Sequence, residues 1–200
     1  MDKIFVIGKD VVPQYVRLDA GGKLNWTLVY SPAPGLSLPE KVSVEVDLCG
    51  EGAELDIAGL YLCPQDEKFQ LDVLVKHVSG GCRSRQLFKG LAGGNARVKF
   101  NGLIYVAKDS QKTKAYQENH TILLSDTARV ETRPQLEIYA DDVECSHGAT
   151  TGYLNPDEEF YMRSRGIPEE DARRLQIISF LSPILSRLPE EMQNDIISKC

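Results

Sequence analysis

Alternation of apolar and polar positions dominates the first three quarters of the chain. From residue 41 to about residue 150, apolar side chains return at every second position in short runs. This period of two is typical of β-strands that bury one face. The clearest runs are 42–48, 69–75, 96–100 and 104–106, and shorter ones precede them at 3–7 and 24–30. The pattern therefore predicts a long all-β region.

Glycines and short polar pairs separate these runs. We expect corners at Gly50, Gly52, Gly59, Gly80-Gly81, Gly90, Gly93-Gly94 and Asn101-Gly102. Asn101-Gly102 is also the one strong hairpin signal. Short strands with tight corners suit a sandwich, a barrel or a β-solenoid. The scarcity of hairpin dipeptides favours stacked solenoid turns, but the pattern alone leaves sandwich and solenoid open.

The period changes to three and four after Gly152, which indicates helices. Asn155 can cap a helix that has Pro156 at its first position, and the acidic residues that follow favour the positive end of the helix dipole. We predict a helix over 156–165, closed by Gly166.

A second helix begins at Pro168 and carries a broad apolar stripe. The stripe consists of Ala172, Leu175, Ile177, Ile178, Phe180, Leu181, Ile184 and Leu185. Pro183 should kink or end this helix, because proline lacks the backbone donor and clashes one turn back. A last short helix starts at Pro189. We divide the chain into a β-domain, 1–152, and a helical domain, 153–200, which packs on its own β-region or on a partner.

Charge and hydropathy narrow the class of protein. The 200 residues include 23 basic and 29 acidic ones, a net charge of −6, and no run of lysine or arginine. Duplex nucleic acid and lipid headgroups are therefore not expected partners. No apolar stretch is long enough for a membrane span or a signal peptide. We expect a cytoplasmic protein with no membrane contact.

Five cysteines without a CxxC pair exclude a disulfide framework and a zinc finger. Such usage fits a reducing compartment. Cys49, Cys63 and Cys82 are expected to be core residues, and Cys200, at the chain end, to be exposed and without a role.

Common enzyme motifs are absent: the sequence has no GxSxG, Walker loop, HExxH or GxGxxG. Adjacent carboxylates at Asp141-Asp142 point to opposite faces of a strand, so they cannot flank one glycosidic bond. We expect them in a polar turn at a strand end. The glycine-rich segment 90–94 is expected to form a corner and not a phosphate cradle.

Cys145 and His147 form the most informative local feature. Positions i and i+2 of a strand share a face, so the thiol and the imidazole could address one metal, or the imidazole could lower the pKa of the thiol. Two ligands are too few for a complete site, so others would come from elsewhere or from a second subunit. The structural alternative is a small buried Cys145 and a surface His147. His77 and His120 are expected to be structural.

Several segments resemble the SufB/SufD proteins of iron–sulfur cluster assembly. They are 111–119, 123–125, 134–143, 145–150 and 160–167, with His77 and the Leu-Phe-Lys-Gly of 87–90 upstream. The likeness covers about residues 73–181. It implies a mainly β protein, a right-handed parallel β-helix followed by a C-terminal helical unit, acting as a scaffold and not as an enzyme.

The resemblance also implies partners and site residues. The C-terminal helices would dock a SufC-type ABC ATPase through Phe160, Tyr161, Arg163, Arg165, Leu175 and Phe180. The last strands would pair with a SufB/SufD-type subunit or a second copy, with Glu137, Tyr139 and Asp141 on the pairing strand. Cys145 and His147 would be cluster ligands at that interface, for a transient iron–sulfur cluster formed only in the complex.

The Cys-Ser-His-Gly version of the motif is SufD-like. Family members have an upstream helical domain and a longer β-helix, so we expect a shortened chain whose residues 1–40 cap the open end. Two alternatives are a docking-only structural partner that has lost cluster chemistry and a β-helix carbohydrate-active protein. The single tryptophan, Trp26, argues against the carbohydrate alternative.

Overall fold

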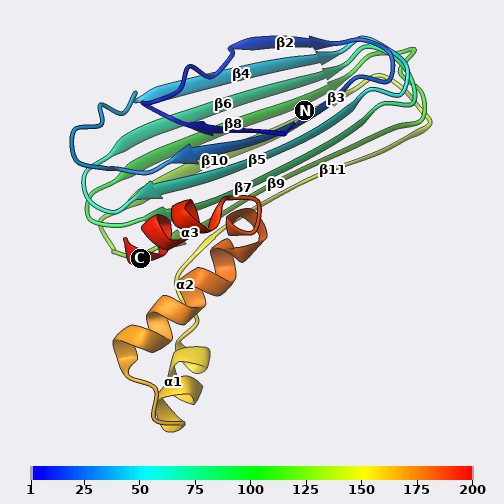
Figure 1. Cartoon of the computed structure of the whole chain (residues 1–200). Helices are drawn as coiled ribbons and strands as arrows, with labels where there is room; N and C mark the ends of the chain where they lie inside the picture. Colours follow the sequence, from blue (N-terminus) through cyan, green and yellow to red (C-terminus); the bar gives the residue numbers. More distant parts are fainter. Residues whose placement is uncertain (1, 200) are drawn as a thin grey trace.

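A computed structural model describes residues 2–199 as a stack of parallel strands with three helices at its C-terminal side (Figure 1). The strands are β1 (Asp2–Val6), β2 (Tyr15–Leu18), β3 (Lys23–Tyr30), β4 (Lys41–Leu48), β5 (Glu54–Cys63), β6 (Lys68–His77), β7 (Arg83–Ala92), β8 (Arg97–Val106), β9 (Thr113–Leu123), β10 (Arg129–Ile138) and β11 (Val143–Gly152). The helices are α1 (Pro156–Ser164), α2 (Glu169–Leu185) and α3 (Glu190–Ser198). Cys200 lies outside the described residues.

The strands form a parallel β-helix. Odd-numbered strands make one sheet, in the order β1-β3-β5-β7-β9-β11, and even-numbered strands make the other, β10-β8-β6-β4-β2. Each turn adds one strand to each sheet. Lys23 pairs with Glu54, Glu54 with Arg83, and Arg83 with Lys114, so these turns take 31, 29 and 31 residues. The parallel pairing confirms the solenoid and excludes the sandwich.

Parallel pairing places residues of the same face in columns along the stack. One inner column of the first sheet runs Trp26, Ile57, Gln86, Gln117 and His147. Its first two members belong to a buried apolar cluster. Burial of each such side chain stabilises the fold by about 1.5–3 kcal/mol.

Three predicted corners are wrong: Gly59, Gly90 and Gly102 lie inside β5, β7 and β8, so Asn101-Gly102 is no hairpin. Each of the three faces the interior where a larger side chain needs the space. A Cβ at Gly59 would collide with the ring of Phe88, and one at Gly90 with the ring of Tyr61. The segment 90–94 is a corner only at its end. Gly52 and Gly81 do occupy corners, with φ of 70° and 67°.

The N-terminal segment extends both sheets. β1 pairs with β3 and β2 with β4, in the same parallel sense as the later strands. The alternation at 3–7 predicted β1, whereas β2 was not predicted. Residues 2–18 thus supply terminal strands to the β-helix, as part of the N-terminal segment that we expected to cap its open end.

The helix ends follow the sequence closely. The Asn155 side chain accepts hydrogen bonds from the backbone N–H of Asp157 and Glu158, and Gly166 follows α1 with a φ of 87°. Pro183 does not end α2, which continues to Leu185. The missing proline N–H would have bonded the Ser179 carbonyl, and the Ser182 hydroxyl donates to that oxygen instead, at 2.9 Å.

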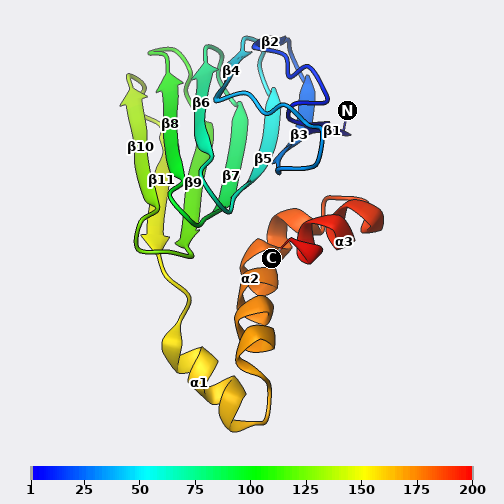
Figure 2. The same cartoon turned by 90° about the vertical axis from the view of Figure 1, so that its left-hand side faces the viewer.

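The helical segment has two parts with different surroundings. The C-terminal half of α2 and all of α3 cover the outside of the first sheet, where Ile177, Leu181 and Ile184 pack with Leu60 and Leu87. α1 and the start of α2 project beyond the strands (Figure 2). We call residues 156–176 the arm. Within residues 2–199, no helix is long and apolar enough to cross a membrane. The division into domains at residue 152 stays a prediction.

Candidate functional site

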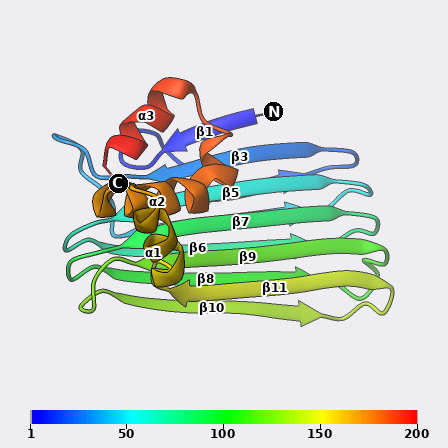
Figure 3. The same ribbon diagram turned by 90° about the horizontal axis from the view of Figure 1, so that it is seen from below.

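Cys145 and His147 lie on β11, the terminal strand of the first sheet, at one end of the stack (Figure 3). Cys145 pairs with Ala115 and His147 with Gln117, both buried residues of β9. Because parallel partners share a face, the thiol and the imidazole both belong to the inner face of the last turn. Among residues 2–199, no further strand pairs with the free edge of β11. The prediction that the two side chains share a face is confirmed.

The surroundings of the two donors differ. Cys145 is half-buried against a small apolar cluster that includes Ile104, Val106 and Ala140. Burial raises the pKa of the Cys145 thiol, which opposes any activation by a nearby imidazole. His147 is exposed. The isolated chain therefore holds a neutral thiol beside an accessible ring.

A polar interior lies directly beneath His147. Gln117 is 1% exposed, and its Nε2 donates to Gln86 Oε1 at 2.8 Å. Within the part of the chain that the structure describes, Gln117 Oε1 is buried without a hydrogen-bond partner. Farther along the strand, Tyr61 Oη bonds the side chains of Asn119 and Thr121. The unpaired hydrogen-bond acceptor, Gln117 Oε1, thus belongs to the residue that pairs with His147 on the neighbouring strand.

This polar interior was not predicted as part of the site. Its signal was present, because polar residues occupy the buried alternate positions of β9, Thr113, Gln117, Asn119 and Thr121. When the period of two is continued through this polar stretch, it assigns these four residues to the buried face of the strand.

Thiolate sulfur and imidazole nitrogen are both known ligands of iron–sulfur clusters. Cys145 and His147 are thus chemically suited to such a cluster as cargo. Across residues 2–199, no group of three or more His, Cys, Asp or Glu side chains is placed to hold a metal ion. Cys145 and His147 alone are too few for a closed site.

The three residues assigned to a pairing strand separate in the structure. Glu137 is in β10, which ends at Ile138, so Tyr139 and Asp141 lie in the turn before β11. That turn also contains Asp142, which confirms the prediction of a polar turn. Tyr139 is 58% exposed, and its ring lies tilted against that of Tyr105 with ring centroids 5.5 Å apart. All three still lie at the end of the stack that carries Cys145.

The arm presents apolar side chains to solvent. Phe160, Tyr161 and Leu175 are 73%, 59% and 47% exposed. Tyr161 and Leu175 line a surface pocket together with Asp157, Glu158, Met162, Gln176 and Ser179.

Charged residues border this patch. Arg163 forms ion pairs with Glu159 and Glu169, and the Arg165 guanidinium lies 5.3 Å from the Tyr161 ring centre. Phe180 is separate, because its ring packs under Lys89 Nζ of β7 at 4.3 Å. Of the six residues predicted for docking, five belong to the arm surface and Phe180 to its junction with the sheet.

His77, His120, Cys63 and Cys82 match their structural interpretation. His77 is fully buried, its Nε2 lies 2.9 Å from Ser84 Oγ, and burial lowers its pKa to about 4. His120 lies between Thr150 and Glu118, at 2.7 and 3.1 Å. Cys63 and Cys82 are buried as expected, whereas Cys49 is only half-buried.

Comparison with known proteins agrees with these features. Residues 11–180 match the family model described as SUF system FeS cluster assembly, SufBD core domain. The chain is 40% identical to the iron–sulfur cluster assembly protein SufD of Escherichia coli over 149 residues, 74% of this chain and 35% of that protein. A SufBD family protein of Mycobacterium bovis is 30% identical over 190 residues, 91% of this chain and 44% of its own length. The chain spans less than half the length of these relatives.

Proposed function

Because the chain belongs to the SufBD family of iron–sulfur cluster assembly proteins, we propose that it is a SufD-like accessory subunit that presents Cys145 and His147 to a nascent cluster. One observation carries the proposal: both donors share the inner face of a terminal strand whose outer edge is free within residues 2–199. The chain itself catalyses nothing in this proposal.

The remaining ligands come from a second subunit. The partner is a SufB/SufD-type chain, or a second copy of this one, that pairs at the end formed by β10 and β11. Unpaired backbone groups on such edges favour strand addition. The same contact removes water from Cys145 and His147. A neutral His147 ring donates a nitrogen lone pair to iron, and the Cys145 thiol must lose its proton before it can bind iron.

A SufC-type ABC ATPase is the proposed partner of the arm. Phe160, Tyr161 and Leu175 form an apolar centre, and Arg163 and Arg165 lie beside it. An apolar core with a charged rim is the usual composition of a protein interface. Within residues 2–199, none of these three side chains belongs to a buried apolar cluster.

One observation favours a second candidate, a docking-only subunit without cluster chemistry. Burial holds the pKa of the Cys145 thiol above its ordinary value, so the thiolate is disfavoured at neutral pH. The raised pKa of the Cys145 thiol has no bearing on the proposed docking surface of the arm.

Anaerobic capture of the tagged protein, with iron and sulfide assays and partner identification, tests both candidates. Cys145→Ser or His147→Ala should lower iron and sulfide severalfold while the ATPase and the second subunit are still captured. Ser146→Ala, whose side chain lies on the opposite face of the same strand, is the matched control. Normal iron and sulfide contents in both variants would contradict the cluster-ligand role and favour the docking-only candidate.

A change on the arm separates docking from cluster chemistry. Phe160→Asp should reduce ATPase capture about tenfold or more, the effect of losing a central interface anchor. Val11→Asp alters a residue that is 90% exposed between β1 and β2, away from the arm, and should have no effect. Unchanged capture by Phe160→Asp would contradict the proposed ATPase surface.

A further inference from the structure

The outer face of the first sheet divides into two halves. The C-terminal half of α2 and α3 lie over the C-terminal ends of the odd-numbered strands and leave the N-terminal ends uncovered (Figure 3). β7 shows the change along one strand: Leu87 and Leu91 pack under the helices, whereas Arg83 and Arg85 are exposed. The uncovered half forms a surface pocket. It is lined by Asp2, Lys23, Leu24, Asn25, Glu54, Leu55, Asp56, Arg83, Ser84, Arg85, Lys114 and Tyr116.

Each of the two arginines has a carboxylate as a register neighbour. Arg83 pairs in register with Glu54 on one side and Lys114 on the other. Arg85 pairs with Asp56 and Tyr116. An ion pair with the adjacent carboxylate would therefore be the simplest arrangement for each arginine.

Other cations already pair with Glu54 and Asp56, the two carboxylates next to the arginines. Lys23 lies 2.9 Å from Glu54, and Arg187, which follows α2, lies 2.6 Å from Asp56. Glu144 of β11 accepts from Lys114 at 2.6 Å and from Tyr116 Oη at 3.0 Å. Within residues 2–199, the guanidinium groups of Arg83 and Arg85 have no ion pair and no hydrogen bond.

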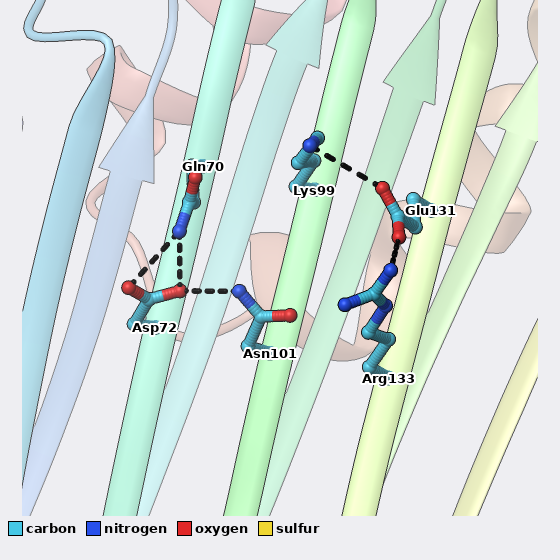
Figure 4. Close-up of polar contacts among 6 residues, drawn as sticks. All are labelled: Gln70, Asp72, Lys99, Asn101, Glu131 and Arg133. Atoms are coloured by element: carbon cyan, nitrogen blue, oxygen red, sulfur yellow. Dashed lines mark hydrogen bonds and ion pairs between the residues drawn. The ribbon is translucent and has the colours of Figure 1, made fainter.

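The outer face of the second sheet is built differently (Figure 4). There Glu131 lies between Lys99 and Arg133 and forms ion pairs with both. Asp72 accepts hydrogen bonds from Gln70 and Asn101. These charged and polar groups therefore pair with one another.

We propose that Arg83 and Arg85 bind a phosphate group in this pocket. The two residues are two positions apart on one strand, about 7 Å along it, so their long side chains can converge on one oxyanion. Each guanidinium offers a fork of donors that matches phosphate oxygens. The ring of Tyr116, 36% exposed, forms a side wall next to Arg85.

The phosphate could be free or part of a nucleotide, and the ring of Tyr116 makes the second case testable. If a base stacks on this ring, adenosine diphosphate should bind more tightly than inorganic pyrophosphate. Equal affinities would indicate that the phosphate groups alone are recognised. Both outcomes agree with the proposed site.

Calorimetric titration of the full chain with inorganic phosphate, pyrophosphate and adenosine diphosphate at fixed ionic strength tests the proposal. The double variant Arg83→Gln/Arg85→Gln should weaken binding about tenfold or more. Lys99→Gln/Arg133→Gln removes the same charge from the opposite face and should leave binding within about twofold.

Three results would overturn the proposal: no saturable binding of any of the three compounds, equal losses in both double variants, or tighter binding of citrate, which would assign the pocket to carboxylates. None of them bears on Cys145, His147 or the arm, so the site can fail without the proposed function.

Discussion

The two ends of the β-helix interior share one backbone pattern but differ in chemistry. Near the N-terminus the interior is apolar and aromatic: Phe5 packs edge-on against Trp26, and Tyr30 stacks on Phe69. In the last turns the equivalent inner positions hold Gln117, Asn119 and Thr121. One column passes from Trp26 through two glutamines to His147. We infer that the first end holds the fold together and the last end serves the site.

The largest effect is expected from a substitution that removes a buried side chain in the apolar end of the interior. Phe88 is fully buried and packs on Phe100 with ring centroids 5.0 Å apart. Phe88→Ala should lower the free energy of unfolding by about 3–5 kcal/mol, because it removes apolar burial and leaves a cavity. Urea denaturation measures the change. Tyr153→Ala, at a residue 60% exposed, should change it by less than about 0.5 kcal/mol.

Stability measured as a function of pH tests the role of His77. This residue lies between the two ends of the interior and pairs in register with Leu48 and Val106. Burial lowers its pKa to about 4, below the ordinary value of 6.5. The unfolded chain then binds a proton that the folded chain rejects, so stability should fall as the pH drops from about 6.5 towards 4, by up to about 3 kcal/mol.

Denaturation midpoints at pH 7.0 and 5.0 measure this loss. His77→Asn should be less stable at pH 7.0 but should lose less stability between the two pH values than the parent. Equal slopes in both proteins would show that other groups cause the acid sensitivity.

The smallest effect is expected from a substitution in the polar end of the interior. Gln117→Leu leaves Gln86 without its buried partner and should lower the free energy of unfolding by about 1–3 kcal/mol. The double variant Gln86→Leu/Gln117→Leu removes both groups and should recover most of that loss. Additive losses in this double-mutant cycle would mean that the two amides do not act as a pair.

Local signals in the sequence predicted much of the fold. The period of two located most strands, Asn155 and Gly166 marked the ends of α1, and the spacing of Cys145 and His147 placed both on one face. These features depend on residues within a few positions of one another, so a single sequence is enough to recognise them.

The glycine errors and the missed polar interior have a common cause. Gly59, Gly90 and Gly102 were interpreted as corners because a glycine usually marks a turn. Their role depends on side chains of neighbouring turns, Phe88, Tyr61 and Gln117. No local pattern contains that information.

The sequence alone therefore determined most of the strands, the three helices, the ends of α1, and which donors lie together on β11. Only the tertiary structure decided which residues become neighbours across turns of about 30 residues, which carboxylates leave Arg83 and Arg85 unpaired, and which part of the helical segment stays exposed. The physical reason is that strand and helix periods arise from adjacent backbone units, whereas contacts in a parallel β-helix join residues a full turn apart and depend on the packing of the whole stack.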